Sequence, residues 1–344
     1  MENNELNLDQ LLGGDWDAPQ EAPAEEMKKI RGNLRKRSIS TIAISVALAA
    51  LLLAVTVFGI VPFAESFYWH PDDTTYLNRT DLQTTIYAFT ELFQPGCWLP
   101  FPTYQKTGFA TWSLDIPVDS AQGRTIYSGT LEKNTLTVSQ QFTDLHNERG
   151  GHWIRWRDAT YTPDPESIAE TTALLEALPS YIKLEASVTF AEDLSMEELW
   201  EFHERWDHHW PDLNIAWVAI RSFEPDGEWT PYCGMNPAFH GGALYNGLFT
   251  DYPHFNLGSA EVPRQLEQHF KSRLQYSADR VEAGRGIIPD NNPNLYQEIL
   301  DYVNENGVYT YGCMVYASPE ILLEMMDDSD VCYIYLSDGW LDVN

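Results

Sequence analysis

The stretch RKRSISTIAISVALAALLLAVTVFGIVPF, residues 35–63, decides how this 344-residue chain is organised. Residues 39–61 contain no Asp, Glu, Lys or Arg. At 1.5 Å per residue they form a helix of roughly 34 Å, which is enough to cross a hydrocarbon core of about 30 Å. A cleavable signal peptide has a shorter apolar region, of about 7–15 residues, after a short basic start. The sequence therefore predicts an uncleaved membrane-spanning helix over residues 38–62.

Charge and aromatic residues predict the orientation of this span. After it the chain continues as ESFYWHPDD, where Phe67, Tyr68 and Trp69 suit the membrane–water interface. We expect a single-pass protein of the cell membrane, surrounded there by lipid. Residues 1–37 form its short, largely disordered cytoplasmic segment, and the chain from residue 63 onward is extracytoplasmic. The basic residues that favour a cytoplasmic N-terminal end are Lys28, Lys29, Arg31, Arg35, Lys36 and Arg37.

Acidic residues dominate the part of the chain after the span. The whole sequence has 51 acidic and 21 basic residues. Residues 1–26 hold eight of the acidic residues, and residues 27–64 hold six of the basic ones, so 43 acidic and 15 basic residues remain beyond residue 64. A net charge of −28 repels nucleic acid and anionic headgroups, which argues against nucleic-acid binding. It suits solubility or, alternatively, a cationic ligand.

The four cysteines all lie in the extracytoplasmic part, where disulfides form. No two have CxxC spacing, which disfavours a zinc ribbon or a thioredoxin-like motif. Cys97 and Cys233 lie in turn-rich loops, whereas Cys313 and Cys332 lie in apolar strands. If a disulfide forms, we expect it between Cys97 and Cys233; the alternative is that all four are free thiols.

The C-terminal half repeats one order of elements. Residues 183–222 read as a strand, a capped helix and a strand, and residues 309–337 repeat that order. Ser195 and Glu198 have the spacing of a capping box, and Ser318 followed by a proline has that of a second helix start. We expect the helices to cover one face of a four-stranded antiparallel sheet, so the sequence predicts an α+β protein. Its extracytoplasmic C-terminal domain, residues 166–344, is expected to be ferredoxin-like (split β-α-β) with a large insertion.

Residues 63–165 are expected to form a separate membrane-proximal region. Leu82, Ile86, Phe89 and Phe93 have helical spacing, and short β-branched and aromatic runs follow them. The tripeptide EKN at 132–134 reads as a hairpin turn. A helix and a β-rich region are thus predicted, ending at the PDPE sequence that precedes the C-terminal domain.

The cytoplasmic segment contains one apolar motif, LNLDQLLGGDWD. It is too short to fold alone, so it is either an inert leader or a linear motif that docks on a cytoplasmic partner. The candidate partner-binding residues are Leu8, Leu11, Leu12 and Trp16.

The sequence FHERWDHHW, residues 202–210, resembles the zinc-protease HExxH pattern with Asp207 in place of the second histidine. His203 and Asp207 share a helix face, and with His208 they would be the site of a membrane-anchored metal-dependent hydrolase. The other interpretation is that the helix needs this apolar face, and we favour it. With no GxxxxGK, GxGxxG or GxSxG pattern either, we predict no catalytic, cofactor-binding or metal-binding residues.

Four stretches resemble the sigma-factor regulator family of membrane-anchored, anti-sigma-like proteins. The longest is LEALPSYIKLEASVTFAEDLSMEELWEFHERW and LNIAWVAI, within residues 175–220, and the next is YGCMVYASPEILLEMM, residues 311–326. TGFATWSLDI, residues 107–116, and RGNLRKRSISTIAI, residues 31–44, are also similar. The resemblance implies a regulator that couples an outside signal to a sigma factor or a small membrane helper protein, without enzymatic activity.

This chain departs from the family in its short cytoplasmic part. Anti-sigma factors of this kind usually hold their partner with a folded helical domain, sometimes with a His/Cys zinc set, whereas residues 1–34 contain neither His nor Cys. Sigma binding would have to use residues 6–16 or a helper protein. A wall-space binding module without cytoplasmic output remains a further alternative.

Overall fold

The computed structural model describes residues 24–75, 79–120, 123–139, 142, 164–211, 213–223, 233–239, 251–282, 284, 286–287 and 292–342. The chain forms two compact units, residues 1–67 and 68–344. The proposed partner-binding residues Leu8, Leu11, Leu12 and Trp16 lie outside the described residues.

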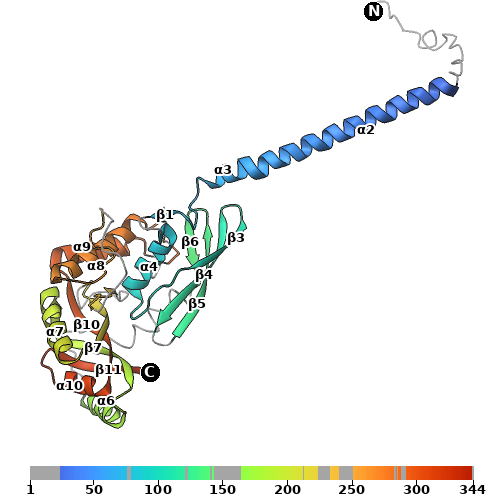
Figure 1. Cartoon of the computed structure of the whole chain (residues 1–344). Coiled ribbons are helices and arrows are strands. Elements are labelled where there is room, and N and C mark those ends of the chain that lie inside the picture. Colours follow the sequence, from blue (N-terminus) through green and yellow to red (C-terminus); the bar gives the residue numbers. More distant parts are fainter. Residues whose placement is uncertain are drawn as a thin grey trace, which may run out of the picture. The chain divides into compact units, whose positions relative to one another are not determined.

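The first unit is one long helical rod, labelled α2 and α3 in Figure 1. It consists of α2 (Ala24–Val55), a π-helical turn η1 (Thr56–Ile60) and α3 (Val61–Glu65). Within the described part of the chain, Glu25–Glu65 is the one helix long and apolar enough to cross a membrane. The helix starts well before residue 38, so residues 24–37 are helical where we expected disorder. Good helix formers and two acids in the first turn, Glu25 and Glu26, explain the early start.

The π-helical turn lies next to a proline. Pro62 has no N–H and its ring clashes with the carbonyl of the residue four positions earlier, so an ordinary α-helix cannot pass through it unchanged. Gly59, a weak helix former, lies in the turn itself. The helix accommodates Pro62 by widening one turn and continuing as α3 to Glu65.

The second unit contains a five-stranded antiparallel sheet in the order β11-β7-β10-β8-β9. Helix α7 joins β7 to β8, and helix α10 joins β10 to β11. The bounds are β7 Lys183–Ser195, α7 Met196–His209, β8 Asn214–Ile220, β9 Gly234–Met235, β10 Tyr309–Ala317, α10 Pro319–Met326 and β11 Val331–Asp342.

Both predicted helix starts of this region are confirmed. The Ser195 hydroxyl accepts from the N–H of Glu198, and the Glu198 carboxylate accepts from the N–H of Ser195, which completes the capping box. At the start of α10 the Ser318 hydroxyl accepts from the N–H of Ile321, with proline at the first helical position.

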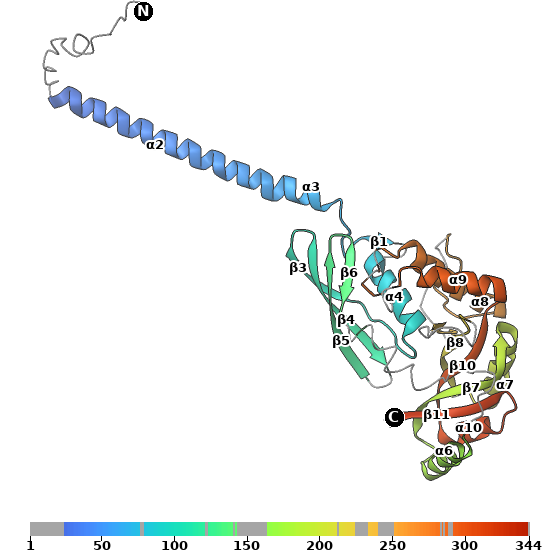
Figure 2. The ribbon, with the colours of Figure 1, turned by 180° about the vertical axis from the view of Figure 1, so that it is seen from behind.

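Long helices lie in the segment between β8 and β10. They are α8 (Pro263–Asp279) and α9 (Leu295–Asn306), which run next to each other in both views (Figures 1 and 2). Helix α4 (Asp81–Phe93) packs against α8, so the segment that follows the membrane span contacts the C-terminal half directly.

The membrane-proximal residues also form a four-stranded meander in the order β3-β4-β5-β6. The predicted turn at 132–134 is confirmed, because Glu132 pairs with Thr135 and Lys133 takes a positive φ of 56°. The remaining bounds are β1 Thr74–Thr75, β2 Arg79–Thr80, β3 Thr103–Gly108, β4 Thr111–Ser120, β5 Gly123–Glu132, β6 Thr135–Val138 and α6 Pro165–Ala177.

One hydrophobic core runs through the second unit. It joins Phe89 of α4, Ile116 of β4, Val188 of β7 and Phe270 of α8, each at most 1% exposed. The boundary that we expected near residue 165 therefore does not separate two cores.

All four cysteines are free thiols in the structure, which is the alternative to a bond between Cys97 and Cys233 that the sequence left open. Cys233 is fully buried, and burial raises the pKa of its thiol. Cys313 lies on β10 and Cys332 on β11, with β7 between the two strands.

Candidate functional site

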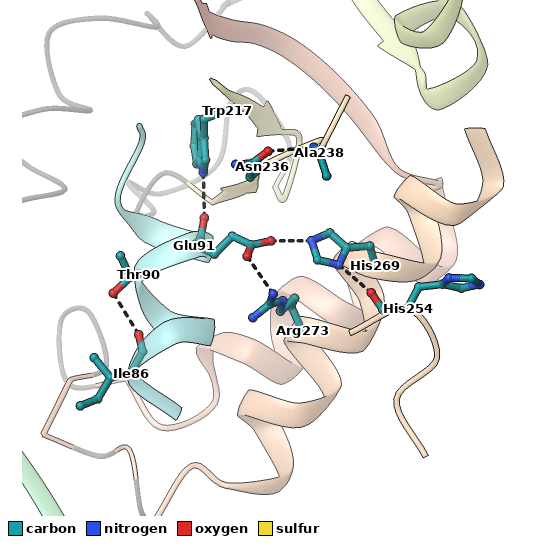
Figure 3. A network of polar contacts seen from close by, with 9 residues as sticks. All are labelled: Ile86, Thr90, Glu91, Trp217, Asn236, Ala238, His254, His269 and Arg273. Atoms are coloured by element: carbon teal, nitrogen blue, oxygen red, sulfur yellow. Dashed lines mark hydrogen bonds and ion pairs between the residues drawn. The ribbon is translucent and has the colours of Figure 1, made fainter. Parts of the chain in front are cut away.

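A buried charge cluster joins α4 to α8 (Figure 3). Its centre is Glu91, in the last turn of α4 and 6% exposed. Its Oε1 lies 2.5 Å from Nε2 of His269, and its Oε2 lies 2.9 Å from an Nη of Arg273. His269 and Arg273 are four residues apart on α8, so they lie on one helix face and both reach the same carboxylate.

Both ring nitrogens of His269 have a polar neighbour. Nδ1 lies 2.7 Å from the carbonyl oxygen of His254, which only accepts, so Nδ1 carries a proton. Nε2 faces the Glu91 carboxylate. Burial alone would raise the pKa of Glu91, but Arg273 and His269 together hold it below its ordinary value. The ionised Glu91 carboxylate therefore lies between Nε2 of His269 and the Arg273 guanidinium.

Arg273 is fully buried and is held by aromatic rings as well as by Glu91. Its guanidinium carbon lies 4.4 Å from the ring centroid of Tyr87 and 4.1 Å from that of Phe255, distances typical of cation–π contacts. Its Nε and Nη1 have no hydrogen-bond partner within the described residues. Replacing Glu91 would thus leave a buried cation with aromatic rings as its main described contacts.

The cluster also reaches the sheet of the C-terminal half. The indole Nε1 of Trp217, on β8, donates to the backbone carbonyl of Glu91 at 2.8 Å. Trp217 is 2% exposed, so this bond is shielded from water. The last turns of α4 are therefore tied to α8 through side chains and to β8 through the backbone.

A cavity of about 190 Å³ lies beside this contact. Glu91 and Trp217 belong to its wall, together with the loop after α4, where Gly96, Cys97 and Trp98 follow one another. The rest of the wall comes from Asn214, Ile215, Ala216, Asn236, Ala238, Phe239 and Tyr316.

A second charged group ties α7 to the turn before β11. One Nη of Arg205 lies 2.9 Å from Asp328 and 2.7 Å from Asp330, and the Trp206 indole donates to Asp328 at 3.0 Å. The Trp210 indole donates to Glu324 at 2.8 Å. These contacts hold α7 against α10 and the turn before β11, so we interpret their role as structural.

The structure does not bring the metal-site candidates together. Within the described residues no three His, Cys, Asp or Glu side chains are grouped to hold a metal ion. His203 is buried and its ring stacks on Phe239 with centroids 3.8 Å apart. His208 lies in the exposed last turn of α7. His203 is thus part of the apolar face of α7, in line with the favoured interpretation.

Sequence reasoning missed the cluster around Glu91. The helix was predicted, but the partners of Glu91 lie 178 and 182 positions further along the chain. Two local signals pointed to it: an acidic residue directly before Leu92 and Phe93, and His269 and Arg273 at helical spacing in α8.

Comparison with known protein families gives a match over part of the chain. Residues 175–337 match the family model described as sigma factor regulator C-terminal, a stretch of slightly less than half the chain. It begins in α6 and ends within β11, so it contains the whole five-stranded sheet except the last residues of β11. No curated protein and no solved structure matches the chain.

Proposed function

We propose that this chain, whose residues 175–337 are a sigma factor regulator C-terminal domain, is a single-pass membrane regulator of the anti-sigma-factor type. The observation that carries the proposal is the presence of that domain in a chain with a candidate membrane span, Glu25–Glu65. The family is regulatory and not enzymatic, which favours a binding function over the hydrolase alternative.

The charge distribution supports the orientation that such a regulator needs. Basic residues cluster before the span, and the regulator domain follows it within a strongly acidic region. In this orientation the domain faces the outside and residues 1–37 face the cytoplasm, where a sigma factor or a small helper protein is available.

The strand order supports a ferredoxin-like assignment for the regulator domain. Numbering β7, β8, β10 and β11 as strands one to four, the observed order is four-one-three-two, with β9 added at the edge. Helices α7 and α10 follow strands one and three, and residues 221–308 form the insertion.

Helix α4 is the proposed link between the span and the regulator domain. It begins at Asp81, soon after the span ends, and Glu91 ties its C-terminal end to α8 and β8. In this proposal an extracytoplasmic signal changes how tightly α4 is held against α8 and β8. Because α4 follows the span in the chain, that change is passed on to the span.

A co-purification experiment tests the cytoplasmic output. The full chain, carrying a C-terminal affinity tag, is recovered from gently solubilised membranes of the host cell, and its partners are identified by mass spectrometry. We expect a sigma factor or a sigma-associated helper protein to be recovered, and Leu11→Ala with Leu12→Ala to abolish that recovery. Asn3→Ala with Asn4→Ala, in the same segment, is the matched control and should leave it unchanged.

Two outcomes count against the proposal. If the intact chain recovers no transcription partner, the anti-sigma role is wrong. If deletion of residues 2–25 leaves sigma-dependent transcription unaltered, the extracytoplasmic domain acts as a wall-space binding module without cytoplasmic output.

A further inference from the structure

The cavity beside Glu91 has an aromatic lining assembled from separate segments. Trp98 comes from the loop after α4, Trp217 from β8, Phe239 from the loop after β9 and Tyr316 from β10. Its volume of about 190 Å³ lies below the range of about 300–1,000 Å³ that is usual for drug-sized ligands. A single small head group fits such a space.

The charges around this cavity disfavour an anion. None of the lining residues that the structure describes is basic. The Glu91 carboxylate is paired with His269 and Arg273, while Glu185, 3% exposed, accepts a hydrogen bond from the Tyr316 hydroxyl at 3.1 Å. The Tyr316 ring therefore has a carboxylate at its hydroxyl end, and the chain beyond the span has a net charge of −28.

We propose that this cavity binds a small organic cation with an ammonium head group. The faces of Trp, Tyr and Phe rings attract cations, Trp most strongly, and grouped aromatic rings are a recurring way to recognise quaternary ammonium groups. The amide side chains of Asn214 and Asn236, which also belong to the lining, supply polar partners for the rest of the ligand.

The position of the cavity lets a ligand contact three separate segments of the second unit. The loop after α4 lies directly on β10, because a Cβ added to Gly96 would be 1.8 Å from the Cε of Met314. Gly96 also has a φ of 61°, which favours glycine. A bound cation contacts the α4 loop and the strands β8 and β10 together and holds them in place. The inference that this ligand is the signal for the regulator rests on the proposed function. The inference that the cavity binds the ligand does not.

A titration with an isosteric pair tests the charge requirement. The full chain is placed in phosphatidylglycerol nanodiscs, which contain no choline, and titrated by calorimetry with choline and with its neutral isostere 3,3-dimethylbutan-1-ol. We expect choline to bind roughly tenfold or more tightly than the isostere, because only the cation is attracted by the faces of the aromatic rings. Equal binding of the two, or no binding of choline, would overturn the proposal.

Variants of two exposed aromatic residues test the location. Trp98 is 52% exposed and lines the cavity, whereas Phe101 is 69% exposed and does not. We expect Trp98→Ala to weaken choline binding at least about tenfold, Trp98→Phe to weaken it less because a ring remains, and Phe101→Ala to have no effect. Unfolding temperatures close to that of the unchanged protein show that the variants fold.

Equal losses in Trp98→Ala and Phe101→Ala would place the site elsewhere and overturn the assignment. If choline does not bind, while the intact chain recovers a sigma factor or helper that the Leu11→Ala, Leu12→Ala variant loses, the ligand site is wrong and the proposed function stands. If choline binds but the intact chain recovers no such partner, the proposed function is wrong and the ligand site stands.

Discussion

Glu91 carries two opposing contributions to stability. Removing a carboxylate from water is costly, and the charges of Arg273 and His269 repay that cost only while all three groups remain together. Such a cluster adds little net stability over an apolar core, yet it is sensitive to the loss of any one member. That sensitivity makes it suited to hold α4 in a defined position.

Replacing Glu91 should therefore destabilise the second unit strongly. We expect Glu91→Gln to lower the free energy of unfolding by about 3–5 kcal/mol, because Arg273 is left buried without a counter-ion. The measurement is urea unfolding of the full chain in micelles, followed by tryptophan fluorescence. The matched control is Glu267→Gln, whose partner Lys271 lies 2.6 Å away at the surface of the same helix α8; we expect a change of about 0.3–0.5 kcal/mol. Similar losses in both variants would contradict a special role for the cluster.

The same residue predicts a dependence on pH. The folded-state pKa of Glu91 is lowered from 4.5, so its ionised form stabilises the fold fully above that value, and the contribution is lost as the pH falls through the lower, folded-state pKa. Unfolding temperatures measured from about pH 6 to about pH 3 should show the difference between the unchanged protein and Glu91→Gln shrinking only in the acidic part of that range. A difference that shrinks already between neutral pH and the ordinary carboxyl pKa would contradict this assignment.

At the scale of elements, the sequence predicts helix starts and turns correctly where they depend on a few neighbouring residues. The capping box at Ser195, the start of α10 at Ser318 and the turn at Lys133 each depend on a few neighbouring residues, and the sequence predicts all three. The helix start at Ala24 was missed because disorder was inferred from polarity, whereas helix-forming residues there continue the span inward.

Contacts that depend on distant residues could not be predicted. The pairing of Glu91 with α8 and the cavity wall require the insertion to fold back onto α4, and nothing in the local spacing specifies that. The same limit applies to Cys97 and Cys233: loop composition made them the candidate pair, but only the packing shows that Cys233 is fully buried with a free thiol.

The capping box gives a prediction for one element. Ser195→Ala should lower the free energy of unfolding by about 1 kcal/mol, because the N–H of Glu198 loses its acceptor at the start of α7. Glu198→Gln keeps an acceptor for the N–H of Ser195 and should cost much less. Both are measured by urea unfolding, and a larger loss in Glu198→Gln would contradict this order.

Strand β9 gives a second prediction at this scale. A Cβ at Gly234 would lie 2.1 Å from the carbonyl oxygen of Val218 and 2.2 Å from the ring of Trp217, both fixed in the core. We expect Gly234→Ala to detach β9 from β8, with faster amide exchange over β8 and a marked fall in unfolding temperature. Gly284→Ala, where the nearest atom is 3.6 Å away, is the control and should leave both quantities nearly unchanged. Equal effects would contradict the tight contact.

For the whole molecule, the orientation in the membrane is the testable property. In a variant without the native cysteines, we expect Asp72→Cys to react with a membrane-impermeant maleimide in intact cells, since the Asp72 side chain is 65% exposed. Asp17→Cys should react only after the cells are broken, because the basic residues before the span keep that end inside. Labelling of Asp17→Cys in intact cells would contradict the orientation.

The π-helical turn at Thr56–Ile60 has a rotational consequence for the span. One additional residue in a turn advances the helix by roughly 100° relative to an uninterrupted α-helix. The side chains that α2 presents on one face are therefore out of phase with those that α3 presents on the same face. Cysteine crosslinking along the span should follow a 3.6-residue rhythm up to Val55 and resume it, shifted by one position, after Ile60.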